Sequence, residues 1–206
     1  MCRCGPLSWW GPGGWSGADN APTRKCTLPD RPPSETTNLD RYGFDPLPWS
    51  RPHDLLAAGP ANSRTTWSLA TIGADARPHA AGVGVRWHDG DLYFTSGPGT
   101  RKARNLVRDP ACVLSVVLEG IDLVLEGEAR RLDDADVFAA VIARFREGGW
   151  PAEVTDGRIV GPYSAPSAGP PPWDLYRFTF RTIFGVATAE PYGATRWRFG
   201  SAGGRE

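Results

Sequence analysis

An alternation of apolar and polar residues with a period of two runs through the chain from residue 66 to residue 132. This period is typical of strands with one buried face, and short turns separate the runs. His88-Asp89-Gly90 is typical of a tight hairpin, because Asp-Gly accepts the positive backbone angles that such turns require. The expected strands are 66–72, 79–87, 91–96, 111–118 and 123–132, with two or three closing strands within 173–180, 182–189 and 194–199. The sequence therefore predicts a mainly β protein.

One strong helix interrupts this pattern. It is expected to begin after an N-cap at Asp133 and to run to about Arg146, where Gly148-Gly149 ends it. Its apolar residues fall at spacings of three and four, which predicts core packing and not a cofactor site. These residues are Phe138, Val141, Ile142 and Phe145. Strands joined by short turns and one crossover helix favour a closed antiparallel barrel of six to eight strands with a few flanking helices.

The regular pattern covers only part of the 206 residues, and we expect one domain. Residues 1–37 have no period and are rich in Gly, Pro and Trp, which predicts a disordered leader. An incorrectly assigned translation start is an alternative explanation of this segment. Residues 38–64 are expected to form an irregular arm that ends in one helical turn, residues 65–199 the barrel, and residues 200–206 a tail. The stretch 151–172 is expected to be a long loop, and long loops in compact domains are often functional.

The charge balance limits the partners of the chain. It has 23 basic and 23 acidic side chains, and this neutrality argues against general nucleic-acid binding. No apolar run reaches the length of a membrane span, so we expect no membrane partner. The start of the sequence lacks the basic head and apolar middle of a secretion signal, which predicts a cytoplasmic protein.

The four cysteines give no sign of a metal site or of disulfides. Cys2, Cys4 and Cys26 have spacings that match no paired zinc-ligand pattern. A redox or metal role for the Cys2/Cys4 pair with the distant Cys26 stays open as the weaker alternative. Cys112 lies within an expected strand and is predicted to be buried.

The segment 91–110 carries the strongest chemical signal. The strand 91–96 ends at Gly97-Pro98-Gly99, Thr100 is a favourable N-cap, and a helix of about two turns is expected to follow. Asp109-Pro110 stops this helix, because the residue before proline avoids the helical region. The segment therefore predicts a strand, a tight turn and the start of a helix at one place.

The first turn of that helix carries Arg101, Lys102 and Arg104. The free amide groups at a helix start have a positive partial charge, so each added cation costs about 0.3 to 1 kcal/mol before screening. A bound phosphate reverses the sign, since both the amide groups and the cations bind it. This favours an anion site, and the alternative is an exposed, solvated basic turn.

Three segments resemble the split-barrel flavin and deazaflavin oxidoreductases, a family often called pyridoxamine 5'-phosphate oxidase-like. They are WSLATIGADARPHAAGVGV (67–85), TRKARNLVRDP (100–110), and the tail APSAGPPPWDLYRF (165–178) with ATRWRF (194–199). The resemblance spans about residues 65–199 and implies a Greek-key split β-barrel. It also implies that hydroxyl and basic side chains of the middle segment hold the phosphate of a cofactor. The cofactor-binding residues expected from it are Thr95, Ser96, Thr100, Arg101, Lys102, Arg104, Asn105 and His79.

The K-x-R-N-L arrangement of residues 102–106 is more similar to the branch that binds the deazaflavin coenzyme F420 than to the FMN branch, and FMN is the alternative. The resemblance implies hydride transfer from the reduced cofactor to an enone, quinone or tetrapyrrole type of molecule. The chain has no counterpart of the Arg-Leu-His-Asp-Arg type run of true pyridoxamine phosphate oxidase, so vitamin B6 oxidation is not expected. A protein that binds a flavin, a deazaflavin or haem without catalysis remains a further alternative, because no strong acid or base stands out.

The resemblance also implies a homodimer with the cofactor at the subunit interface. Trp173 or Tyr176 is then a candidate to cover the cofactor ring from the facing subunit, although aromatic residues on strands are usually core residues. Asn105 is expected either to donate to a cofactor oxygen or to be solvated. For His79, an ordinary structural hydrogen bond is the alternative to contact with the ring.

Overall fold

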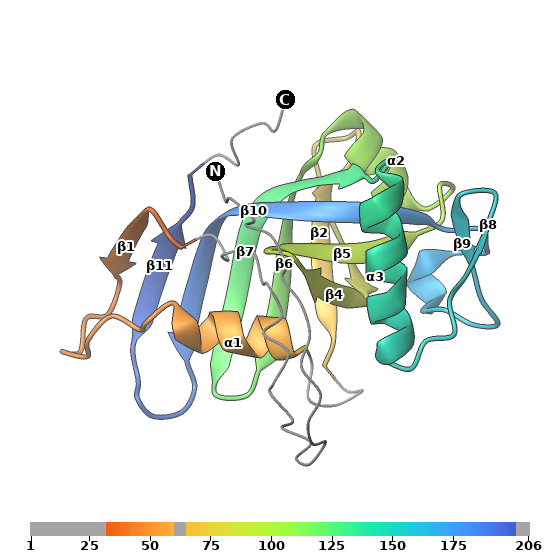
Figure 1. The fold of residues 1–206 in the computed structure, drawn as a ribbon. Coiled ribbons are helices and arrows are strands. Elements are labelled where there is room, and N and C mark those ends of the chain that lie inside the picture. Colours follow the sequence, from red (N-terminus) through yellow and green to blue (C-terminus); the bar gives the residue numbers. More distant parts are fainter. Residues whose placement is uncertain (1–31, 60–64, 201–206) are drawn as a thin grey trace, which may run out of the picture.

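The computed structural model describes residues 32–59 and 65–200, so most of the predicted leader and tail lie outside the described residues. The main strands are β1 (Glu35–Asn38), β2 (Trp67–Ile72), β3 (Pro78–Val83), β4 (Val85–His88), β5 (Asp91–Ser96), β6 (Ala111–Leu118), β7 (Ile121–Arg131), β10 (Asp174–Ala187) and β11 (Ala194–Arg198). A small hairpin is formed by β8 (Glu153–Thr155) and β9 (Arg158–Val160). The helices are α1 (Ser50–Ala58), α2 (Arg101–Arg108), α3 (Ala135–Glu147) and the short 3-10 helix η1 (Pro166–Ala168) (Figure 1).

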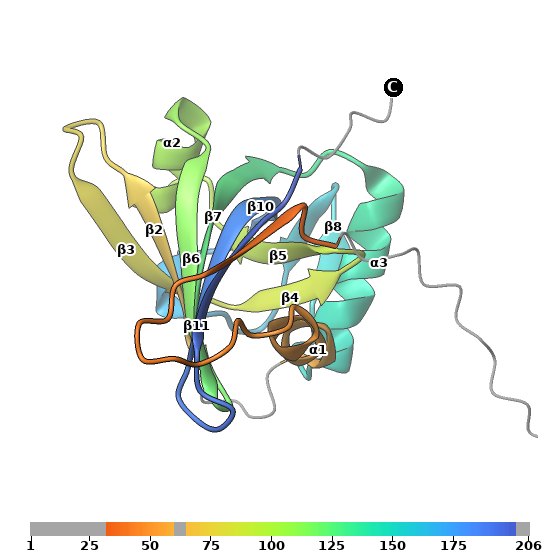
Figure 2. The same cartoon turned by 90° about the vertical axis from the view of Figure 1, so that its left-hand side faces the viewer.

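The nine main strands form one antiparallel sheet that curves into a split barrel (Figure 2). The order is β1-β11-β10-β7-β6-β2-β3, with β5 paired to β10 and β4 paired to β5. One edge of the long strand β10 pairs with β7, and its other edge pairs first with β5 and then with β11. Gly84 alone separates β3 from β4, so the chain itself joins the two ends of the barrel. The predicted mainly β, antiparallel architecture with few helices is confirmed.

The strand count exceeds the expected six to eight because of two differences. The expected strand 79–87 divides at Gly84 into β3 and β4. Residues 35–38 form β1, which pairs with β11, so the prediction of a disordered leader is wrong for residues 35–37. Backbone pairing with an exposed sheet edge, which has no local sequence period, accounts for this second difference.

Three further boundaries differ from the prediction. The stretches 173–180 and 182–189 are one strand, β10, whose register shifts between Phe180 and Thr182, because a bulge bends a strand without ending it. The arm before the barrel contains α1, which has nine residues and not a single turn. The N-cap of α3 is Asp134 and not Asp133, since Oδ1 of Asp134 accepts hydrogen bonds from the amides of Asp136 at 3.0 Å and Val137 at 3.1 Å.

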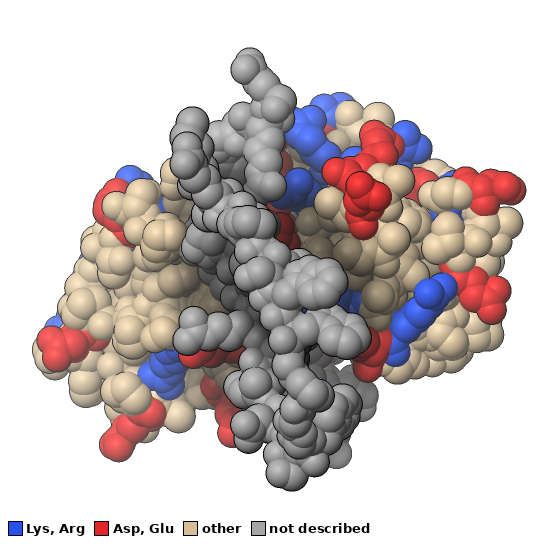
Figure 3. All heavy atoms as spheres, viewed as in Figure 1, with Lys and Arg blue, Asp and Glu red and all other residues tan. Residues whose placement is uncertain are grey.

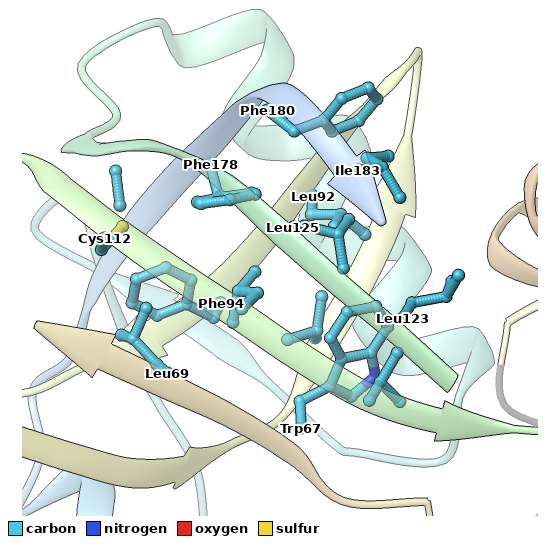
Figure 4. Packing of buried hydrophobic residues seen from close by; sticks show 14 of the residues in the cluster. Trp67, Leu69, Leu92, Phe94, Cys112, Leu123, Leu125, Phe178, Phe180 and Ile183 are labelled. Atoms are coloured by element: carbon cyan, nitrogen blue, oxygen red, sulfur yellow. The ribbon is translucent and has the colours of Figure 1, made fainter. Parts of the chain in front are cut away.

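The core has two parts that share the central strand β5, all of whose residues are buried. Leu92 and Phe94 point into the barrel and pack with Trp67 and Leu125 (Figure 4). Tyr93 points the other way, into a second cluster under α3. The predicted core role of the α3 stripe is confirmed for Val141, Ile142 and Phe145, and Cys112 is buried as predicted. Because β5 is fixed on both faces, its C-terminal end is a rigid support for the segment that follows.

Two negative findings concern residues 32–59 and 65–200 only. Within these ranges no helix has the length and apolar character needed to cross a membrane. The same ranges contain no cluster of three or more His, Cys, Asp or Glu side chains suited to a metal ion.

Candidate functional site

The turn between β5 and α2 is organised by two hydroxyl groups. Thr100 is the N-cap of α2 as predicted, and its Oγ1 accepts a hydrogen bond from the amide of Ala103 at 3.2 Å. The same Oγ1 lies 2.8 Å from Oγ of the fully buried Ser96 and 3.0 Å from the carbonyl oxygen of Gly97. These contacts fix the direction of the first turn of α2. The amide groups of a first helical turn have no carbonyl partner within the helix and point out of its N-terminal end.

The three cations of this first turn have different surroundings. Lys102 is 2% exposed, and its Nζ donates a hydrogen bond to the carbonyl oxygen of Ser167. Arg101 is half exposed, with Nη2 at 4.0 Å from Oδ1 of Asp75, whereas Arg104 folds back to donate to the carbonyl oxygen of Gly99. The alternative of a solvated basic turn is therefore wrong for Lys102.

Burial of Lys102 has an electrostatic consequence. Desolvation lowers the pKa of its ammonium group, and its hydrogen-bond acceptor is a neutral carbonyl oxygen, not a carboxylate. A buried cation without an anionic partner is costly unless something else compensates the charge. A phosphate group is a suitable compensating partner, because it supplies full negative charge and several acceptor oxygens.

His79 lies on β3, beside the start of α2. Partial burial lowers its pKa below the ordinary value, and the charges of Arg101 and Lys102 lower it further. The imidazole is therefore close enough to both cations to be affected by their charges, and its grouping with them in a cofactor site stays a prediction. A lowered pKa favours the uncharged form of the imidazole.

Asn105 has a structural contact inside the protein. It is 4% exposed, and its Nδ2 donates to Oγ1 of Thr71 on β2 at 3.0 Å. The expected alternative of a solvated side chain is therefore wrong. The hydrogen bond ties α2 to the sheet and holds the first turn of the helix in place.

The end of the loop 151–172 lies against this basic turn, and the sequence gives no sign of it. The amide of Gly97 donates to the carbonyl oxygen of Ala168 at 2.7 Å, and Oγ of Ser167 donates to the carbonyl oxygen of Gly82 on β3. A Cβ on Gly97 would lie 2.8 Å from the oxygen of Ala168, so the glycine permits this close approach. The loop also contains the unpredicted β8-β9 hairpin, which Arg158 attaches to Asp174 at 3.0 Å. The loop is therefore ordered and forms one wall of the site.

Trp173 and Tyr176, the predicted aromatic covers, are 2% and 4% exposed. Nε1 of Trp173 donates to the carbonyl oxygen of Gly169 at 2.8 Å, and the ring of Tyr176 stacks on Phe94 with centroids 5.2 Å apart. Both side chains therefore belong to the core of their own chain, and the prediction that one of them covers a ligand in a facing subunit is wrong for this arrangement.

A pocket of about 200 Å³ adjoins the basic turn on the side of α3. It shares Thr95 and Ser167 with the surroundings of the turn, and its other walls are mainly aromatic and aliphatic. They include Val83, Arg86, Phe145, Trp150 and Tyr163. Sequence reasoning missed Arg86 on β4 and Trp150 and Tyr163 in irregular segments, because they are far apart in the sequence and share no motif.

The sequence of the chain matches the family profile of pyridoxamine 5'-phosphate oxidase over residues 58–187. No curated protein matches the chain. Similar solved structures include a candidate 5-nitroimidazole antibiotic resistance protein from Bacteroides thetaiotaomicron, which has a TM-score of 0.50 and 11% identity over 80% of this chain and 89% of that chain.

Two further similar structures have lower TM-scores. A NimC/NimA family protein from Clostridium acetobutylicum has a TM-score of 0.45 and 20% identity over 64% of this chain and 84% of that chain. A heme binding protein from Mycobacterium smegmatis has a TM-score of 0.48 and 15% identity over 68% of this chain and 54% of that chain. At these identities the likeness concerns the fold alone.

Proposed function

Because the chain belongs to the pyridoxamine 5'-phosphate oxidase family, we propose that it is an oxidoreductase that holds a tricyclic redox cofactor by its phosphate group. The observation that carries this proposal is the buried Lys102, which donates to a neutral carbonyl oxygen and lies beside Arg101 and the first amides of α2. Such a group of donors fits a phosphate. The proposed cofactor is the deazaflavin coenzyme F420, with FMN as the alternative.

The described residues have binding and positioning roles in this proposal. Arg101 and Lys102 supply charge, the first amides of α2 supply hydrogen bonds, and Ser96 and Thr100 hold the turn in its conformation. When bound, the cofactor supplies the hydride chemistry. Ser167 and Ala168 cover the inner side of the turn and limit the access of water to Lys102. The proposed acceptor is an electron-poor enone, quinone or tetrapyrrole, and vitamin B6 oxidation is not proposed.

The distribution of charge favours a small anion over a polymer. Basic and acidic side chains are interspersed over the face in Figure 3, outside the grey atoms. The chain carries equal numbers of the two kinds, so the positive charge at α2 is a local feature. A polyanion such as nucleic acid is normally bound by an extended basic surface.

The direct test is a side-by-side fluorescence titration of the purified chain with coenzyme F420 and FMN, after its absorbance as isolated is recorded. Tighter binding of coenzyme F420, at micromolar affinity or better, supports the proposed cofactor. Tighter binding of FMN moves the protein to the alternative. Binding of neither contradicts the proposed function. If a cofactor binds but its reduced form is never oxidised by enones, quinones or tetrapyrroles, the protein is a binding module without catalysis.

We further propose that the protein acts as a homodimer with the cofactor at the subunit interface. Val117 on β6 and Val186 on β10 are both exposed, and they flank Asp122 of β7 on the outer face of the sheet. Exposed valines on the face of a sheet are suited to contact with a second copy. Light scattering coupled to size-exclusion chromatography checks this, and a monomer at micromolar concentration contradicts it.

His79 is expected to make cofactor binding depend on pH. Its pKa is lowered in the free protein, and a bound phosphate raises it by offsetting the charges of Arg101 and Lys102. Protonated His79 then adds to the attraction, so affinity is expected to rise about threefold or more as the pH falls through the range below the ordinary histidine pKa. This extra rise is expected to be absent in His79→Gln.

The measurement is a set of cofactor titrations from about pH 7.5 to about pH 5 with both proteins. The difference between the two profiles isolates His79, because ionisation of the phosphate itself contributes equally to both. Parallel profiles for the wild type and His79→Gln would place the imidazole outside the phosphate site.

A further inference from the structure

Arg86 has an unusual position in the pocket beside the basic turn. It extends from β4 towards the C-terminal end of α3, where its Cζ lies 5.5 Å from the centroid of the Phe145 ring. Nη1 donates to the carbonyl oxygen of Val85 at 2.9 Å and Nη2 to that of Gly148 at 3.4 Å. These bonds use two of the five guanidinium N–H groups, which leaves three for a ligand.

No carboxylate of the described residues lies within ion-pair distance of Arg86. Burial alone lowers the pKa of its guanidinium group, with no opposing contribution from an acidic side chain. Two other arginines of the described residues do have such partners: Arg158 of the β8-β9 hairpin binds Asp174 at 3.0 Å, and Nε of Arg177 on β10 lies 2.6 Å from Oδ2 of Asp91. A partly buried cation without an acidic partner is a favourable place for an external anion.

The walls and size of the pocket limit the form of that anion. Phe145 and Trp150 lie edge to face with centroids 5.5 Å apart, and Nε1 of Trp150 donates to the carbonyl oxygen of Tyr163 at 2.6 Å. Planar aromatic walls favour a planar aromatic guest. A volume of about 200 Å³ suits a single ring with one small substituent, because an apolar cavity of about 150 Å³ accepts benzene and sites for larger ligands begin near 300 Å³.

We propose that this pocket binds a small, one-ring aromatic carboxylate, with the carboxylate on Arg86 and the ring against Phe145 and Trp150. Thr95 and Ser167 line both this pocket and the basic turn, so a guest here lies next to the proposed cofactor site. Among the proposed acceptors, a one-ring quinone or enone that carries a carboxylate matches this size and charge and a tetrapyrrole does not, and that substrate role rests on the proposed function. Binding of the carboxylate does not rest on it.

Gly148 provides a second way to test Arg86. A Cβ on Gly148 would lie 2.2 Å from Nη2 of Arg86, and the glycine has φ −77°, which alanine adopts without strain. The three nearest atoms all belong to the end of this flexible side chain, so Gly148→Ala is expected to displace the guanidinium group and leave the fold intact. Arg144→Met is a matched control, because it removes one positive charge from α3 at an exposed position outside the pocket.

The experiment is a ¹⁹F NMR titration of the full chain, without cofactor, using 4-fluorobenzoate and its uncharged analogue 4-fluorobenzamide. The acid is expected to bind the wild type with a Kd of about 1 mM or better. The amide is expected to bind at least tenfold more weakly. Arg86→Met is expected to weaken binding of the acid at least tenfold and to abolish the preference for the acid over the amide. Gly148→Ala is expected to weaken binding of the acid at least threefold. Arg144→Met is expected to leave binding of the acid unchanged.

Several results would overturn the proposal. They are absence of acid binding to the wild type at 10 mM, equal binding of the acid and the amide, unchanged binding to both pocket variants, and competitive displacement of the acid by FMN or coenzyme F420. The last of these would assign the pocket to the cofactor ring. The result stays separable from the proposed function, since acid binding without any cofactor binding leaves the pocket standing while the oxidoreductase proposal fails.

Discussion

Lys102→Met is expected to weaken binding of the phosphate-bearing cofactor at least tenfold and, at the same time, to raise the melting temperature of the cofactor-free protein. The buried ammonium group costs free energy in the folded state, because its hydrogen-bond acceptor there is a neutral carbonyl oxygen. Methionine fills a similar volume without a charge. A gain of about 1 kcal/mol in the free energy of unfolding corresponds to about 2–4 °C for a chain of this size.

The pH dependence of that gain has a defined sign. Folding lowers the pKa of Lys102 below its unfolded value, so the folded state penalises the charged form. This penalty is fully present below the folded pKa and disappears as the pH rises through the folded pKa towards the unfolded value. The difference in melting temperature between Lys102→Met and the wild type is therefore expected to be largest near neutral pH and to shrink at alkaline pH.

Cofactor titrations and thermal unfolding scans from about pH 7 to about pH 10 check both expectations. Arg108→Met is the matched control, because it removes a cation from the last turn of α2, at the opposite end from the basic turn. Its cofactor affinity is expected to equal that of the wild type. Unchanged cofactor affinity in Lys102→Met would remove Lys102 from the phosphate site, and a lowered melting temperature would mean that its hydrogen bond to Ser167 outweighs the cost of the buried charge.

Gly127→Ala is expected to destabilise the protein by about 3 kcal/mol or more, the largest effect of a single methyl group that the structure predicts. A Cβ at Gly127 of β7 would lie 2.2 Å from the carbonyl oxygen of Thr179 and 2.8 Å from Cα of Phe180. Both are backbone atoms of the longest strand, β10, at the bulge that follows Phe180. No side-chain rotation relieves the clash, so the β7-β10 ladder has to shift.

Gly82→Ala is the control for Gly127→Ala. Gly82 lies on β3, where a Cβ would have no neighbour closer than 3.9 Å, so the substitution is expected to leave stability within about 1 kcal/mol of the wild type. Chemical denaturation of the three proteins provides the comparison. Equal unfolding midpoints for the two variants would mean that the bulge at β10 absorbs the methyl group.

Local sequence signals were sufficient to predict most of the strands of the barrel and the basic turn. Thr100 as the N-cap, the Asp89-Gly90 hairpin and the helix stop at Asp109-Pro110 depend on the conformations that single residues allow, and these hold in any surroundings. The alternation along β5 likewise separated Phe94 from Tyr93, which pack into different clusters. Predictions failed where the cause was remote in sequence, as for β1, whose pairing partner β11 follows about 160 residues later.

The sequence by itself determined the mainly β architecture, the position of the turn between β5 and α2, and the presence of three cations there, because periodicity, capping and charge are properties of neighbouring residues. Only the tertiary structure decided what those cations do. It buried Lys102 under the loop that carries Ser167, left Arg101 half exposed, and turned Asn105 to Thr71. It also assembled Arg86, Phe145 and Trp150 into one pocket. Burial and the absence of an acidic partner depend on which distant segments pack together, and no local pattern carries that information.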